Sequence, residues 1–223
     1  MDGSSGVRPF RTAETQRLDA FVDAAFAFAV SLLIIGGTEP LRSFTDLATA
    51  LARIPAFIFG FALIALFWSA HRTWSTLTPV RTGWTTLLSL AVVFAVLVFV
   101  FPLRLLAETA THFMSGGTLP GGGLMSSLGD LRWTYVIYGV AFAVLAGLNA
   151  LLFAHAARAL NGDALAHRKA RQWTGTWSVA TATGLLSSLI AATPLLAVAP
   201  WLPGVAYNLI PVGVGVILWR SRR

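Results

Sequence analysis

Three charged side chains stand where a long apolar segment of this chain begins. Arg17, Asp19 and Asp23 lie within a few positions of one another, and the segment that follows has no charged residue before Glu39. Charge inside or beside a membrane span is energetically expensive, and it usually marks an ion path, a proton path or a contact between helices. The residues around these charges are therefore the first candidates for function.

The two acids need partners from elsewhere in the chain. On a helix, Asp19 and Asp23 stack at i,i+4, where like charges repel. Arg17 lies about 120° around the helix from Asp23, so it pairs poorly with that acid. At the end of a second apolar segment, His71 can accept from one group and donate to another. We therefore predict a buried network of Arg17, Asp23 and His71. The alternative is that Trp68 only anchors the membrane interface and that His71 is solvated.

The composition is that of an integral membrane protein. Of the 223 residues, 56% are hydrophobic and only 11% are charged, whereas a soluble domain needs far more polar surface. The absence of cysteine excludes disulfides, thiolate metal sites and cysteine nucleophiles. The net charge of +7 does not indicate a nucleic-acid partner, because the basic residues sort by membrane side.

Apolar runs long enough to cross a bilayer recur six times along the chain. They are continuous rather than alternating, which indicates helices and argues against a β-barrel. We predict an all-α polytopic membrane protein with six transmembrane helices per subunit, forming a single domain over residues 1–223. The predicted spans are 18–37, 47–70, 84–106, 132–155, 174–199 and 203–219.

The connections between these spans carry an uneven share of lysine and arginine. Twelve basic residues fall on one side of the membrane and four on the other. This asymmetry predicts that both termini are cytoplasmic and that the glycine-rich segment near Gly122 is external. The cluster of Arg168, Lys169 and Arg171 can contact anionic lipid headgroups, although topology alone explains its position. The four residues on the external side are Arg42, Arg53, Arg104 and Arg132.

The first span divides into two stripes at about 100° per residue. The bulky stripe comprises Phe21, Phe28, Leu32 and Ile35, and the small stripe comprises Ala20, Ala24, Ala27 and Ser31. Small residues let membrane helices approach closely, and a serine hydroxyl can bond to the carbonyl four residues earlier. A bulky stripe faces lipid by default. The alternative is that several copies converge on an axis as a hydrophobic constriction.

Two motifs in the first two spans occur together in one known family. A match to Arg-x-x-x-Phe-Ser-Asp begins at Arg17, with Val22 in place of the serine, and Phe-Ala-Phe-Ala-Val-Ser-Leu-Leu follows it. The second span carries Trp68-x-x-His71, and a Phe-Pro pair lies near the end of the third span. In these features the chain resembles the transmembrane protein 175 family of potassium channels, in its short prokaryotic form.

This resemblance implies a homotetramer of six-helix subunits in a prokaryotic cell membrane, with the first helix of each subunit lining a central pore. It implies a passive channel, potassium-selective or weakly selective, with potassium ions as the permeant substrate and no cofactor. Val22 and Phe28 depart from the family pattern, and the bulk of Phe28 would narrow the pore. The pore constriction falls on Phe28, Leu32 and Ile35, the pore hydroxyl on Ser31, and the structural network on Arg17, Phe21, Asp23, Trp68 and His71.

Two other classes of function fit the sequence less well. A proton-coupled transporter would use Asp23 and His71 as a relay, but no internal repeat or matching pair of interrupted helices supports it. An enzyme is not indicated, because the carboxylates and histidines lack metal-ligand spacing and a nucleophile with its base. A channel of this sequence has no Thr-Val-Gly-Tyr-Gly filter, so selectivity would depend on a narrow apolar constriction with hydroxyls nearby.

Overall fold

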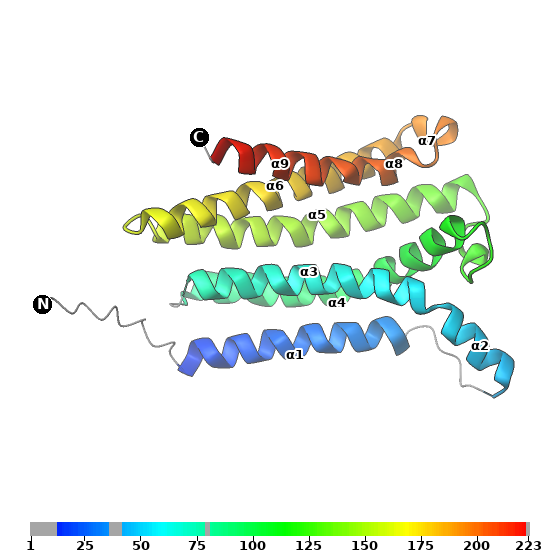
Figure 1. Cartoon of the computed structure of the whole chain (residues 1–223), viewed down its shortest axis with the longest axis horizontal. Coiled ribbons are helices and arrows are strands. Elements are labelled where there is room, and N and C mark those ends of the chain that lie inside the picture. Colours follow the sequence, from blue (N-terminus) through cyan, green and yellow to red (C-terminus); the bar gives the residue numbers. More distant parts are fainter. Residues whose placement is uncertain (1–12, 36–41, 79–80, 222–223) are drawn as a thin grey trace, which may run out of the picture.

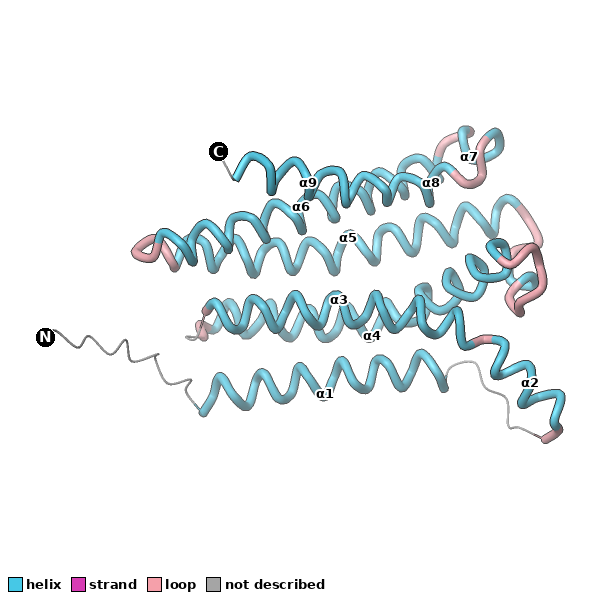
Figure 2. Tube along the Cα trace, in the orientation of Figure 1, coloured by secondary structure: helices cyan, strands magenta, loops and turns pink. Residues whose placement is uncertain are grey.

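The computed structural model describes residues 13–35, 42–78 and 81–221, and every regular element within these ranges is a helix. The longer helices lie side by side, and α2 extends the bundle at one end (Figure 1). A loop containing η1 connects α4 to α5, and a short loop connects α5 to α6 (Figure 2). The elements are α1 (Ala13–Ile35), α2 (Phe44–Ala52), α3 (Ile54–Leu77), α4 (Gly83–Met114), η1 (Gly122–Leu124), α5 (Leu128–Ala159), α6 (Ala164–Ala192), α7 (Leu195–Val198), α8 (Leu202–Val205), η2 (Ala206–Asn208) and α9 (Leu209–Ser221).

Four of the described helical segments are long and apolar enough to cross a membrane. They are Ile54–Leu77, Gly83–Met114, Leu128–Ala159 and Leu202–Arg220. Each of the predicted spans overlaps one or more of the helices, so the all-helical fold class is confirmed. Because α1 begins and α9 ends at the same end of the bundle (Figure 1), the chain crosses it back and forth.

Two predicted boundaries are wrong, and a proline is the reason in both cases. The predicted span 47–70 joins two helices, because the chain turns at Arg53 and Pro55 lies in the first turn of α3. Proline is tolerated in the first turn of a helix, because the backbone N–H that it lacks would have no partner within the helix there. The predicted span 174–199 runs past the end of α6, where Thr193 is extended at ψ 166°. A following proline, here Pro194, favours that conformation.

Among the described helices, α5 and α6 share the most extensive contact. A Cβ atom added to Gly139 of α5 would lie 2.8 Å from the carbonyl oxygen of Gly184 on α6. One turn further along α6, Ser188 donates a hydrogen bond of 3.3 Å to the carbonyl of Val136 on α5. Small residues at such positions let two membrane helices approach until their backbones touch. This pair supports α4 and α3, which pack against it.

A cluster of aromatic rings joins four helices at the centre of the bundle. Phe67 of α3 lies in the middle and is fully buried. Its ring contacts Phe99 of α4 at 5.9 Å, Phe142 of α5 at 5.6 Å and Trp177 of α6 at 5.2 Å between centroids. Helix association in membranes depends on such close packing. The cluster therefore holds α3 to α6 together, and α1 packs on the outside of α3 and α4.

Polar side chains decide where several helices begin. The side chain of Ser43 caps α2. Capping boxes start α4 and α5, through Thr82 with Thr85 and through Ser127 with Asp130. Each such cap satisfies a backbone N–H that has no partner within the helix and stabilises the helix by about 1 kcal/mol. The starts of these helices are thus set by polar side chains next to the apolar segments.

Candidate functional site

The helix α1 packs on its own subunit through one stripe of side chains. Val22, Phe26, Ala29 and Leu33 are buried. Their spacing of three or four residues places them on one side of the helix, against α3 and α4. Val22, which replaces the serine of the family motif, is completely buried. A valine therefore fits the packing at this position, whereas a serine hydroxyl would need a hydrogen-bond partner there.

The opposite side of α1 faces away from the subunit. Phe21 and Phe28 are 53% and 56% exposed. Leu32 is half-buried and packs against the core, so it lies at the edge of this outward side. The side chain of Ile35 lies outside the described residues. Of the bulky stripe predicted from helical phase, Phe21 and Phe28 therefore point outward, and Leu32 lies between the outward side and the packed side of α1.

The predicted stripe of small residues also faces outward, and we call it, together with Phe28, the open face of α1. Its small members are Ala20, Ala24, Ala27 and Ser31, all of which are exposed. The hydroxyl of Ser31 donates to the carbonyl of Ala27 at 3.2 Å, as predicted. Because the hydroxyl hydrogen is used in this bond, the oxygen can still accept from or coordinate a group that approaches the open face.

Asp19 is held by an ion pair that the sequence did not reveal. Arg81 Nη2 lies 2.9 Å from Asp19 Oδ1, and Ser75 Oγ donates to Asp19 Oδ2 at 2.7 Å. Arg81 also donates to Ser75 Oγ at 2.6 Å and to the carbonyl of Thr78. Its guanidinium lies over the ring of Trp74, 4.4 Å from the centroid. The arginine side chain is only 3% exposed, so this is a buried ion pair, in which Arg81 Nε makes no hydrogen bond within the part of the chain that the structure describes.

Asp23 is partnered by a tryptophan rather than by a histidine. Trp68 Nε1 donates to Asp23 Oδ1 at 2.7 Å, and the guanidinium of Arg72 lies over the Trp68 ring, 5.2 Å from its centroid. The expectation that an acid of α1 finds its partner on another element is confirmed, because both acids bind side chains outside α1. Asp23 itself is exposed on the subunit surface, not buried as predicted.

His71 is buried and binds a different helix. Its Nε2 and Ser89 Oγ of α4 share a hydrogen bond of 3.0 Å. Among the contacts of the described residues, none joins Arg17, Asp23 and His71 directly, so the single network predicted for these three is wrong in its connections. The reason is that Trp68 supplies the donor to Asp23 and Ser89 is the partner of His71.

Asp23 and His71 are nevertheless neighbours, as predicted. They line one hollow of about 270 Å³, together with Asp19, Arg72, Ser75 and Thr76. Arg17 lies elsewhere, at an exposed position that lines a second hollow with Phe21 and Leu90. Within the part of the chain that the structure describes, no group of three or more acidic or histidine side chains is arranged to hold a metal ion.

The contacts of Asp19 and Asp23 fix how α1 sits on α3. Asp19 binds Ser75 near the end of α3, and Asp23, one turn further along α1, binds Trp68, earlier in α3. The order reverses because the two helices run in opposite directions (Figure 1). Hydrogen bonds are directional, so two of them on successive turns set both the rotation and the register of α1. The open face is thereby held pointing away from the subunit.

The part of the chain that carries α1 and its anchors matches a known family. Residues 17–102 match the model of the family described as endosomal/lysosomal potassium channel TMEM175. A protein of Marivirga tractuosa that is named potassium channel is 32% identical over 107 residues. The match covers 48% of this chain and 43% of that protein, so the chain spans less than half the length of this relative.

Two solved structures share the fold over nearly the whole chain. A crystal structure of a variant of the potassium channel MtTMEM175 superposes with a TM-score of 0.77 at 23% identity and covers 98% of this chain and 100% of that one. A crystal structure of a lysosomal potassium-selective channel TMEM175 homolog from Chamaesiphon minutus superposes with a TM-score of 0.61 at 22% identity, over 95% and 100% of the two chains. The resemblance to the TMEM175 family that the motifs predicted is thereby confirmed over residues 17–102, and the two solved structures show that the fold is shared over nearly the whole chain.

Proposed function

We propose that this chain forms a passive cation channel, selective or weakly selective for potassium. The observation that carries the proposal is the open face of α1, where small side chains and Phe28 point away from the subunit. Two directional contacts, from Asp19 and from Asp23, hold that face outward. The names of the relatives, which are potassium channels, support the choice of ion.

In the proposed assembly, four subunits surround one axis and α1 of each subunit lines the pore. Each subunit contributes six spans, α1 and α6 in addition to the four apolar segments named above, as a single domain. The constriction consists of Phe28, Leu32 and Ile35, with the hydroxyl of Ser31 beside it. The exposure of Phe28 and the position of Leu32 at the edge of the open face support this arrangement. A hydrophobic ring of this kind gates by dewetting.

Arg17, Phe21, Asp23, Trp68 and His71 are proposed to have a structural role in the channel. The contacts of Asp23 and His71 with neighbouring helices support that role. The constriction, rather than a ring of backbone carbonyls, would then determine which ions pass. No cofactor takes part in the proposed conduction, and the surrounding lipids and the other three subunits are the partners of each subunit.

The proposed orientation places both termini in the cytoplasm of a prokaryotic cell, with the protein in the cell membrane. The start of α1 and the end of α9 lie at one end of the bundle (Figure 1). That same end of the bundle carries three arginines, Arg72 and Arg158 near the ends of α3 and α5, and Arg81 after α3. The other end carries Arg53 and Arg104. The positive-inside rule assigns the more basic end to the cytoplasm.

Ion flux through liposomes that contain the purified protein tests the proposal. We expect potassium flux to exceed sodium flux, and Phe28→Ala and Leu32→Ala to raise conductance and loosen selectivity, because a wider apolar ring wets more easily. Phe94→Ala is the matched control, since Phe94 lies on α4 and is 71% exposed. Unchanged flux in both α1 variants would show that the stripe faces lipid, and a monomer in lipid would exclude the pore.

The same assay separates a second candidate, a proton-coupled transporter or proton leak. The observation that favours it is that Asp23 and His71 line one hollow. A transporter would couple proton movement to the movement of another ion, and Asp23→Asn would abolish the coupled flux. A passive channel predicts that potassium flux follows its own gradient and is independent of an imposed proton gradient.

A further inference from the structure

The end of the bundle at which α9 stops carries a cluster of exposed arginines. Arg168 and Arg171 lie in the first turns of α6, before the apolar part of that helix begins, and both are exposed. Arg220 lies in the last turn of α9 and is also exposed. The way in which α6 and α9 pack decides whether these three side chains share one site.

Two glycine contacts fix the register of α6 and α9, which run in opposite directions (Figure 1). A Cβ atom added to Gly175 of α6 would lie 3.1 Å from Ile217 Cδ1 of α9. One added to Gly213 of α9 would lie 2.7 Å from Val179 Cγ1 of α6. A step of four residues forward along α6 therefore matches a step of four residues backward along α9.

All three arginines lie on the sides of α6 and α9 that face each other. On α9, Arg220 follows Ile217 by three residues, and on α6, Arg171 and Arg168 precede Gly175 by four and seven residues. Positions three, four or seven apart lie on one side of a helix. In the same register, Arg220 is level with the residue that follows Arg171. The three side chains therefore extend from the facing sides of two packed helices, within about one helical turn of one another.

The positive charge of this cluster is not balanced by acids. Within the part of the chain that the structure describes, none of the three arginines forms an ion pair. The acid closest to them in the sequence, Asp163, accepts hydrogen bonds of 3.0 Å from the backbone N–H groups of Leu165 and Ala166 and so caps α6. Even with the charge of Asp163 counted, three arginines leave an excess of two positive charges. Like charges one turn apart on a helix repel, and a bound anion would remove this repulsion.

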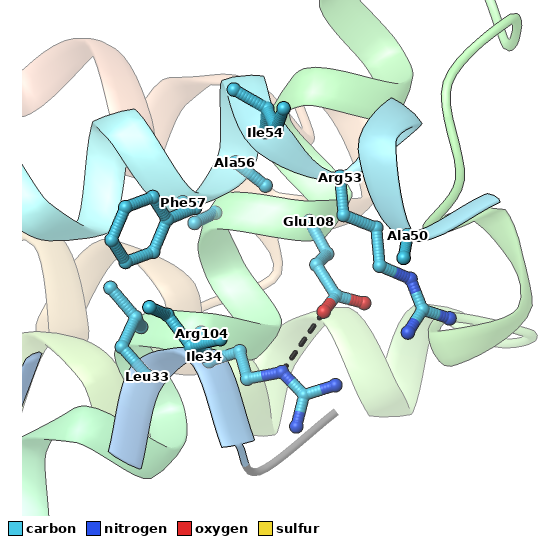
Figure 3. A pocket seen from close by; sticks show the side chains of 10 residues that line it. Leu33, Ile34, Ala50, Arg53, Ile54, Ala56, Phe57, Arg104 and Glu108 are labelled. Atoms are coloured by element: carbon cyan, nitrogen blue, oxygen red, sulfur yellow. Dashed lines mark hydrogen bonds and ion pairs between the residues drawn. The ribbon is translucent and has the colours of Figure 1, made fainter. Parts of the chain in front are cut away.

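The opposite end of the bundle shows an arginine whose charge is balanced. There Arg104 and Glu108 of α4 line a pocket of about 210 Å³ (Figure 3). Arg104 Nε donates to Glu108 Oε1 at 3.0 Å. An arginine that is paired within its own helix in this way does not need an external anion, in contrast to the cluster at the ends of α6 and α9.

We propose that Arg168, Arg171 and Arg220 bind the phosphate of an anionic phospholipid at the membrane surface. Guanidinium groups form strong hydrogen bonds with phosphate oxygens, and basic sites at the ends of membrane helices bind anionic headgroups. The positive-inside rule explains on which side of a membrane arginines lie, but it does not require arginines of two helices to converge. In the proposed orientation, the lipid belongs to the cytoplasmic leaflet.

The surface of α9 provides an apolar path for the acyl chains of this lipid. Of the four apolar segments named above, Leu202–Arg220 is the least buried. Val212, Val216 and Trp219 recur along it at spacings of three and four residues, and all three are exposed. Because α9 and α1 lie on opposite sides of the bundle (Figure 1), a pore lined by α1 would leave this surface facing lipid. One ligand with an anionic head and apolar chains fits both features.

Lipid binding to the purified protein in detergent tests the proposal. The protein is titrated separately with phosphatidylglycerol, phosphatidylcholine and inorganic phosphate. Native mass spectrometry counts the bound molecules, and thermal unfolding is followed in parallel. We expect phosphatidylglycerol to bind and to raise the unfolding temperature, and the other two probes to have little effect. Equal binding of phosphatidylcholine, or equal protection by inorganic phosphate, would overturn the proposal.

Single substitutions locate the binding. Arg171→Gln and Arg220→Gln should each weaken phosphatidylglycerol binding by about tenfold, because each removes one charge-assisted contact with the phosphate. Lys169→Gln is the matched control and should have little effect, since Lys169 lies next to Arg168 but about 100° around the helix from it. Arg42→Gln, at an exposed arginine of the opposite end, controls for the net charge of the protein.

The controls and the unfolding temperatures decide against the proposal in three cases. Equal losses in Lys169→Gln and Arg220→Gln would show that binding follows the overall charge of this end. No loss in either arginine variant would show that the lipid binds elsewhere. Without lipid, both arginine variants should unfold at the same temperature as the unsubstituted protein or at a higher one, because a repelling charge is removed. A lower temperature in both would show that the arginines have partners within the protein.

The test remains decisive if one variant does not fold, because Arg171→Gln and Arg220→Gln remove contacts from different helices and either one is sufficient. Binding is measured directly on the protein and involves no ion flux. A failure therefore leaves the proposed channel function standing.

Discussion

The two ends of α1 are held against the same neighbouring helices by different kinds of contact. At the end where α1 begins, polar contacts dominate. Asp19 binds Arg81 and Ser75, and Asp23 accepts from Trp68. Each of these contacts needs a particular distance and angle, and the buried position of Arg81 makes its loss expensive.

At the other end of α1 the contacts are apolar. Leu33 is buried against α3, where a Cβ atom added to Gly60 would lie 2.7 Å from Leu33 Cδ2. At this end the surfaces of α1 and α3 fit together. Among the contacts of the described residues here, no hydrogen bond joins the two helices, so none sets the rotation of α1 relative to α3. Close packing fixes the distance between two helices and tolerates small rotations.

The helix α1, with its open face, is thus positioned by two kinds of contact. Polar contacts at one end set which residues of α1 face outward, and apolar contacts at the other end set how closely α1 approaches α3. Breaking the polar end should therefore reduce stability and release the rotation of α1. Disturbing the apolar end should change the spacing of α1 and α3 and leave the rotation in place.

The largest effect is expected from the buried ion pair. Arg81→Gln leaves the carboxylate of Asp19 without its cation in a largely buried position, which should reduce the free energy of unfolding by roughly 3–5 kcal/mol. Unfolding in detergent by heat or denaturant measures this loss. Arg72→Gln is the control, because Arg72 is exposed and stacks on a tryptophan. An equal loss in both variants would show that the buried pair is no more important than a surface arginine.

A smaller effect is expected at the second polar anchor. Trp68→Phe keeps the ring but removes the N–H that donates to Asp23, and the loss of one hydrogen bond to a charged acceptor should cost about 1–2 kcal/mol. Trp84→Phe on α4, where the indole is 55% exposed, is the matched control. If Trp68→Phe leaves stability unchanged but alters ion preference in liposomes, Asp23 faces the ion path and its structural role is refuted.

At the apolar end of α1, stability should depend on the volume of the side chains rather than on hydrogen bonds. Gly60→Ala places a methyl group against Leu33 and should destabilise the protein by about 1 kcal/mol, because the overlap is with the movable end of a side chain. Leu33→Ala in the same chain should restore part of that loss in a double-mutant cycle. Gly215→Ala is the control, since a Cβ atom there meets nothing within 4 Å. Additive effects of the two substitutions would mean that Gly60 and Leu33 are not in contact.

The smallest effect on stability is expected from the carboxylate of Asp46, an exposed residue of α2. The backbone N–H of Arg42 and the side chain of Ser43 hold the pKa of Asp46 below its usual range. A lowered pKa in the folded state means that the contribution to stability is present above the unfolded-state pKa and is lost as the pH falls through the folded-state value. Titration of the Asp46 carboxyl by NMR measures this pKa, and Ser43→Ala should raise it. A pKa that Ser43→Ala leaves unchanged would contradict this assignment.

The sequence was sufficient for the features that depend on local composition. Apolar runs indicate helices wherever a chain must satisfy its backbone hydrogen bonds in lipid, so the existence of α1 and α3 to α6 could be predicted, whereas the predicted ends differ from the observed ones by up to ten residues, at the start of α6. Helical phase separated Phe21 and Phe28 from the buried residues of α1. The repulsion between Asp19 and Asp23 predicted that these acids bind partners on another element. Each of these conclusions needs only neighbours along one helix.

The identity of those distant partners depends on how the helices pack, which the sequence did not reveal. Arg81 counted in the sequence as one of many basic residues near a membrane surface. The family resemblance placed Trp68 in a structural network with Asp23 but assigned no contact to it. In the structure the two side chains bind Asp19 and Asp23. Val22 departs from the family motif but is buried in the packing of α1. A helical sequence specifies the angle between its own side chains, whereas the partner of a side chain depends on which helices pack together and in which register, and distant segments decide that.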